Sequence, residues 1–177
     1  MPASGTFATK LNEQIANEFA AHQQYVACAV YYEAETLPQL AAFFYRQALE
    51  ERGHAMMMIQ YLLDTGADVV TPGITAPRIS FDDVTEPIAL ALDQEREVAA
   101  QINALAATAR EEQDFASEQF TQWFIAEQIE EVATMSDLLT VAQRSRERVM
   151  EIEDFLAREH PGEDGPDAGA PRPAGGP

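Results

Sequence analysis

Apolar residues recur along four long segments at steps of three and four, the period of a helix that buries one face. A shorter segment with helical character follows them. The predicted helices span about residues 7–35, 38–64, 85–112, 114–143 and 146–158. Pro38 suits the first turn of the second helix, and Gly66 suits a position just after its end. The pattern predicts an all-α fold, a four-helix bundle with a short fifth helix.

Two segments lack this pattern. Residues 67–83 contain Pro72, Gly73 and Pro77, and we expect a long irregular connection that carries the chain back along the bundle. Residues 160–177 are rich in proline, glycine and acidic side chains, with too little apolar surface to compensate the entropy of ordering. We therefore predict one domain over residues 1–159 and a flexible tail over residues 160–177.

Each of the four long apolar stripes is interrupted near its middle by side chains of the metal-binding type. They are Glu18 in the first helix, Glu51 and His54 in the second, Glu95 in the third, and Gln128 and Glu131 in the fourth. Burying a carboxylate is costly unless a positive group lies beside it. Four buried carboxylates on separate helices therefore indicate a pair of metal ions between the helices.

The spacing of these residues suggests how two ions would be shared. Residues three apart lie on one helix face, so Glu51 and His54 can reach the same ion. Di-iron bundles combine one Glu from each of two helices with a Glu-x-x-His pair from each of the others. Here the fourth helix has Gln128-x-x-Glu131 instead. One ion would take Glu18, Glu51 and His54. The other would take Glu51, Glu95 and Glu131, and without an imidazole it should be held more weakly.

Composition limits the partners and the setting. The 30 acidic residues against 11 basic ones give a net charge of −19, which repels nucleic acid and anionic membranes and favours cations. Cys28 is the only cysteine, so a disulfide framework and a Cys-x-x-Cys site are excluded. We see neither a secretory signal nor an apolar run of membrane-spanning length, and we expect a cytoplasmic protein.

Taken together, four motifs resemble those of non-haem ferritins of the bacterial type, over about residues 7–159. The motifs are Asn17-Glu18-Phe19 with Tyr25, Glu50-Glu51-Arg52-Gly53-His54, Gln94-Glu95-Arg96, and Glu127-Gln128-Ile129-Glu130-Glu131. The resemblance implies a hollow homo-oligomeric shell of 24 subunits. Such a shell oxidises Fe(II) to Fe(III) with O2 or peroxide at a di-iron centre and stores the ferric mineral.

The resemblance also implies roles for individual residues. The first iron site corresponds to Glu18, Glu51 and His54, and the second to Glu51, Glu95 and Glu131, with Gln128 beside it. The third iron site corresponds to Glu50, Glu127, Glu130 and Glu131. Tyr25 matches a tyrosine next to the centre, as an electron or hydrogen-bond donor. Haem-containing bacterioferritins place Met and His where this chain has Arg52 and Glu131, so the resemblance implies no haem.

Other readings stay open at this point. His22 lies one turn from Glu18, where a hydrogen-bonded core histidine is expected more often than a metal ligand. Glu118 corresponds to the family's entry channels, and an ordinary exposed glutamate explains it equally well. The chain could also be a di-iron or di-manganese oxidase with an organic substrate, or a bundle with an interaction role whose carboxylates only confer solubility.

Overall fold

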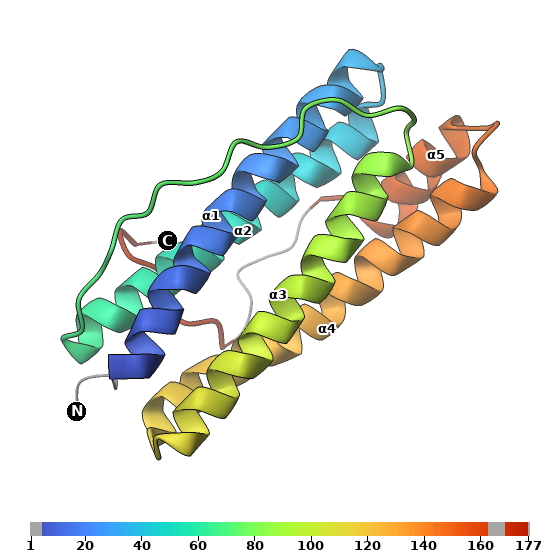
Figure 1. The fold of residues 1–177 in the computed structure, drawn as a ribbon. Helices are drawn as coiled ribbons and strands as arrows, with labels where there is room; N and C mark the ends of the chain where they lie inside the picture. Colours follow the sequence, from blue (N-terminus) through green and yellow to red (C-terminus); the bar gives the residue numbers. More distant parts are fainter. Residues whose placement is uncertain (1–4, 163–168, 177) are drawn as a thin grey trace.

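The computed structural model describes residues 5–162 and 169–176, and within these residues the fold is entirely helical (Figure 1). The helices are α1 Gly5–Ala34, α2 Pro38–Thr65, α3 Glu86–Glu111, α4 Phe115–Arg144 and α5 Met150–Glu159. The predicted all-α bundle is confirmed. The fifth helix starts at Met150 and not near Arg146, because the Arg148 N–H donates to the Ser145 carbonyl (2.8 Å) in a turn that precedes the helix.

Short turns join α1 to α2 and α3 to α4, so each pair forms an antiparallel hairpin. Residues 66–85, the crossover, connect the two hairpins and run the length of the bundle alongside α1, as Figure 1 shows. Two amide side chains of α1 hold the crossover in place. Asn12 accepts from the Val70 N–H (2.7 Å), and Gln24 accepts from the Arg78 N–H (2.8 Å). The crossover therefore determines where α3 begins.

The apolar core is divided into two clusters along the bundle axis. One cluster contains Tyr25, Tyr32 and Phe44, and it includes residues from all five helices. The other contains Phe7 and Phe124 and occupies the opposite half of the four long helices. The polar residues that interrupt the stripes lie in sequence between these two clusters on every long helix. Apolar packing at both ends thus holds a polar layer in the middle of the bundle.

Residue Glu153 connects α5 to the start of α2. It is buried, and its two carboxylate oxygens accept from the backbone N–H groups of Gln39 (2.8 Å) and Leu40 (2.9 Å). Leu37, at the N-cap of α2, offers no side-chain hydrogen bond. Glu153 therefore satisfies donors that a helix start leaves unpaired, and its negative charge lies at the positive end of the helix dipole.

The described part of the C-terminal segment contacts α2. The Ala174 N–H donates to the Met56 carbonyl (2.9 Å), and Arg172 lies 3.6 Å from an Asp64 carboxylate oxygen. Residues 163–168 and Pro177, which belong to the same predicted tail, lie outside the described residues. Flexibility of this tail stays a prediction. Within the described ranges, no helix is long and apolar enough to cross a bilayer.

The capping role of Glu153 can be tested by the substitution Glu153→Ala. We expect this change to cost about 1–3 kcal/mol of unfolding free energy, because it leaves the buried Leu40 N–H and the partly buried Gln39 N–H without their acceptor. Asp154→Ala is a matched control at an exposed position of the same helix. Thermal unfolding followed by circular dichroism would measure both variants. Equal unfolding temperatures for the two would contradict the capping role.

Candidate metal centre

Three buried side chains meet in the polar layer. Glu18 comes from α1, while Glu51 and His54 come from one face of α2. Each offers one ligand atom, and these atoms all lie within 4.8 Å of one another. The Nδ1 atom of His54 is 3.8 Å from Glu18 Oε2 and 3.6 Å from Glu51 Oε2. Two carboxylates and an imidazole therefore converge on one point, as a divalent metal ion requires.

The carboxylate oxygens at this point are poorly satisfied. Both oxygens of Glu51 and Oε2 of Glu18 are buried without a hydrogen-bond partner. Buried polar atoms nearly always have partners, and an orphaned carboxylate oxygen is especially costly. A cation between these oxygens would satisfy all of them. The donor set therefore fits Fe(II) or another first-row divalent ion.

The three groups strongly affect one another's ionisation. Burial raises the pKa of Glu51 well above its usual range, and repulsion from Glu95 and Glu18 raises it further. Burial also opposes ionisation of Glu18, but the neighbouring His54 and Glu51 outweigh it, and the pKa of Glu18 is lowered. The pKa of His54 is raised well above its usual value by the two carboxylates, against the effect of burial. A cation at these ligand atoms would therefore compete with protons on Glu51 and His54.

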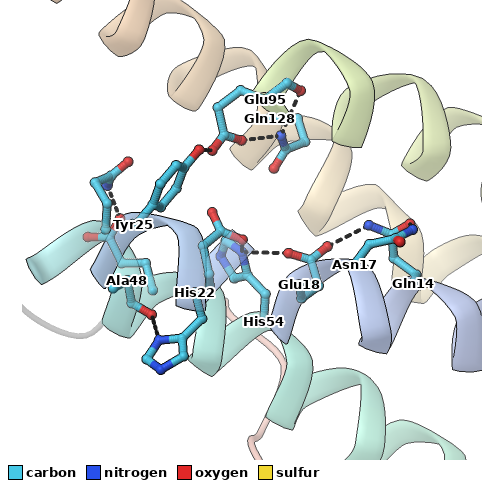
Figure 2. A network of polar contacts seen from close by, with 12 residues as sticks. Gln14, Asn17, Glu18, His22, Tyr25, Ala48, His54, Glu95 and Gln128 are labelled. Atoms are coloured by element: carbon cyan, nitrogen blue, oxygen red, sulfur yellow. Dashed lines mark hydrogen bonds and ion pairs between the residues drawn. The ribbon is translucent and has the colours of Figure 1, made fainter. Parts of the chain in front are cut away.

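On the opposite side of the layer, Glu95 of α3 already has protein partners. The Tyr25 hydroxyl donates to Glu95 Oε1, and Gln128 Nε2 donates to Oε2 (2.9 Å), as Figure 2 shows. Burial, followed by the charge of Glu95, raises the pKa of Tyr25 well above its usual range, which keeps the phenol protonated as the donor. Glu95 is therefore engaged, whereas Glu51 has both oxygens free of hydrogen bonds.

Glu131 is buried beside a pocket of about 220 Å³ between α2, α4 and the residues that follow α5. The other three carboxylates implied for a third iron site, Glu50, Glu127 and Glu130, line the same pocket, which we call the acidic pocket. Burial, Glu95 and Glu50 raise the pKa of Glu131 well above its usual range. The fold thus brings the four residues to one pocket. Their binding of metal stays a prediction.

A sequence model of known proteins, described as a ferritin-like domain, matches residues 8–145. The chain belongs to the ferritin family. It is 54% identical over 171 residues to ferritin BfrB of Mycobacterium tuberculosis, covering 96% of this chain and 93% of that protein. It is also 37% identical over 123 residues to a bacterial non-heme ferritin of Staphylococcus aureus, covering 70% and 74%.

A solved open-pore ferritin of Archaeoglobus fulgidus has a similar fold. The TM-score is 0.86 at 26% sequence identity, and the match covers 90% of this chain and all of that one. The resemblance drawn from the four motifs is therefore confirmed at the level of the family and of the fold. Which individual residues bind metal stays a prediction for this ferritin chain.

The structure shows the surroundings of His22 and Glu118, whose roles the sequence left open. His22 donates from Nδ1 to the Ala48 carbonyl (2.6 Å) and points away from the centre (Figure 2), as a hydrogen-bonded core histidine would. Glu118 forms an ion pair with Arg110 at 2.6 Å.

The rings of Trp123 and Phe124 contact the His54 ring edge-on, with centroids 5.6 and 5.8 Å away, and so limit its rotation.

Sequence analysis missed one buried residue of this ferritin site. Gln14 of α1 is 2% exposed, and its Nε2 donates to Glu18 Oε1 (2.8 Å). A signal was present in the sequence, because Gln14 lies four positions before Glu18 and falls between the apolar residues Leu11 and Ile15.

The raised pKa of Glu51 leads to a pH-dependent stability. Because the unfolded chain loses this proton near pH 4.3, the metal-free fold loses stability as pH rises from there to the higher folded pKa. The isosteric change Glu51→Gln removes the charge. We expect the metal-free variant to be more stable than the wild type at pH 8, by about 1.4 kcal/mol for each unit of the raised pKa, and similar to it at pH 4.

Scanning calorimetry with a chelator, at several pH values, would measure this difference. Glu97→Gln, at an exposed carboxylate of α3, is the matched control and should show no such trend. A Glu51→Gln variant less stable than the wild type at pH 8 would show that the pKa of Glu51 is not raised in the fold.

Proposed function

We propose that this ferritin chain stores iron and is a ferroxidase, with Fe(II) as its substrate. The observation that supports this most is the convergence of Glu18, Glu51 and His54, whose ligand atoms lie within 4.8 Å of one another while three carboxylate oxygens lack partners. Glu51, with both oxygens available, would bridge two Fe(II) ions. Glu95 and Glu131 would complete the second position, with Gln128 and Tyr25 hydrogen-bonded to Glu95.

The proposed reaction balances with either oxidant. Two Fe(II) ions give one electron each, so one H2O2 and two protons yield two Fe(III) and two waters, while O2 and two protons yield two Fe(III) and H2O2. The protons displaced from Glu51 and His54 on binding of Fe(II) are available nearby for this step. The chemistry requires only that two ions be held close together and then released.

The two positions differ in how ready they are to bind. At the first, Glu18 and His54 face each other without any intervening hydrogen bond. At the second, both oxygens of Glu95 already accept a hydrogen bond, from Tyr25 and from Gln128, so each has one lone pair fewer for an ion. We therefore propose that the first position fills first and that the second holds iron more weakly. A weak second position suits a centre that passes Fe(III) onward.

We propose that the acidic pocket receives this iron. Glu131 would belong to both the second position and the pocket, which also contains Glu50, Glu127 and Glu130. An ion could thus move from the centre into the pocket while remaining near carboxylates.

We propose further that 24 copies assemble into a shell in the cytoplasm. Exposed apolar side chains such as Ile79, Phe115 and Ile129 would supply part of the subunit contacts.

The alternative function, an oxidase with an organic substrate, has less support. Such an enzyme would need a largely apolar pocket against its metal pair. The acidic pocket is instead lined mainly by polar side chains, among them five carboxylates against one arginine, Arg46, and this excess of acidic groups favours cations. Size-exclusion chromatography separates the two functions, because storage requires a very large, iron-loaded particle, whereas a monomer or dimer would support the oxidase.

Glu51→Ala and His54→Ala test the ferroxidase proposal. Each should assemble like the wild type yet oxidise Fe(II) at least about 10- to 100-fold more slowly, since mutation of residues that only hydrogen-bond to metal ligands already lowers activity by such a factor. Stopped-flow absorbance after mixing with O2 or H2O2 would measure the rate. Asp137→Ala, an exposed carboxylate on α4, is the control. Wild-type oxidation rates in both site variants would refute the proposed site.

A further inference from the structure

One residue behind the ligands has both of its amide atoms engaged. Gln14 Nε2 donates to Glu18 Oε1 (2.8 Å), and Gln14 Oε1 accepts from Asn17 Nδ2 (3.2 Å), all on α1. A carboxylate can only accept, so the NH2 group of Gln14 must face Glu18. Its oxygen must then face Asn17, which must donate. The carboxylate of Glu18 therefore fixes the donor and the acceptor of both hydrogen bonds, which join residues seen side by side in Figure 2.

These hydrogen bonds make the two carboxylate oxygens of Glu18 unequal, because only one of them accepts a hydrogen bond. Oε1 is occupied by Gln14, while Oε2 is buried, has no hydrogen-bond partner and faces His54 Nδ1 at 3.8 Å. The carboxylate of Glu95 is arranged differently, because Tyr25 and Gln128 occupy both of its oxygens. One terminal carboxylate thus presents a free oxygen to an incoming ion, and the other does not.

An apolar side chain would fill the position of Gln14 at lower cost than a buried amide, since Leu11 and Ile15 on either side are fully buried. Resting on the proposed function, we infer that Gln14 is a positioning residue. It holds Glu18 so that a single oxygen, Oε2, binds the first metal ion, and it thereby makes the first position ready before the second.

Binding of Co(II), which O2 does not turn over, tests this inference on the assembled protein. Gln14→Met keeps the length of the side chain and removes the donor, and Gln14→Glu keeps its shape and replaces the donor by an acceptor. Both should weaken the tighter Co(II)-binding step by about 10- to 100-fold and leave the weaker step unchanged, since residues that orient ligands typically have effects of this size.

A spectroscopic readout separates positioning from packing. When Gln14 no longer occupies Oε1, Glu18 can bind through both oxygens, so the visible absorption of bound Co(II) should change in shape and intensity. Gln122→Met, at an exposed position of α4 where the amide donates to the Glu118 carbonyl of the same helix, should leave affinity and spectrum as in the wild type. Wild-type affinity and spectrum in Gln14→Met would overturn the inference.

Asn17→Ala provides an independent test at a half-buried position, which matters if Gln14→Met fails to assemble. It removes the hydrogen bond that Asn17 donates to Gln14 Oε1 and leaves the bond from Gln14 to Glu18 in place. The same tight step should therefore weaken by a smaller factor, and no change at all would count against the inference. Glu51→Ala separates this question from the proposed function. If Glu51→Ala abolishes tight Co(II) binding and Gln14→Met does not alter it, only the role of Gln14 fails.

If the wild type binds no Co(II), or binds it no more tightly than Glu51→Ala does, the proposed function fails as well. These two failures are therefore distinguishable in the same set of titrations.

Discussion

A cluster of buried carboxyl groups with unsatisfied oxygens, at the middle of the bundle, is the constraint on which the rest of this structure depends. Glu18 and Glu51 are each 1% exposed, and three of their four carboxylate oxygens have no hydrogen-bond partner. Such groups are tolerated only where the surrounding fold is stable enough to hold them. The two apolar clusters on either side of the layer supply that stability, and the crossover places α3 so that Glu95 faces the same layer.

The arrangement is unequal, and the inequality follows from local hydrogen bonding. Glu18 has one oxygen held by Gln14 and one free, Glu51 has both free, and Glu95 has both held. In such an arrangement, the half with Glu18 and Glu51 offers more carboxylate oxygens free of hydrogen bonds than the half with Glu95 does. That suits a substrate ion that enters, reacts and leaves, whereas a permanently bound cofactor would be better served by two prepared halves.

Much of this architecture could be predicted from the sequence, because the polar interruptions fall on the helical period of the stripes. That period alone places Glu18, Glu51 and His54 on faces that turn inward. It could not place Glu130, which is exposed and off the stripe, and yet the fold brings it to the acidic pocket with Glu131. The cap that Glu153 provides to α2 was also beyond prediction, because it joins residues more than 110 positions apart.

Anomalous diffraction from crystals soaked anaerobically in limiting Fe(II) would show directly where the first ion binds. We expect the first peak between Glu18, Glu51 and His54, with a second peak toward Glu95 and Glu131 that appears only at higher Fe(II). A first peak in the acidic pocket, or no peak among Glu18, Glu51 and His54 at saturating Fe(II), would contradict it.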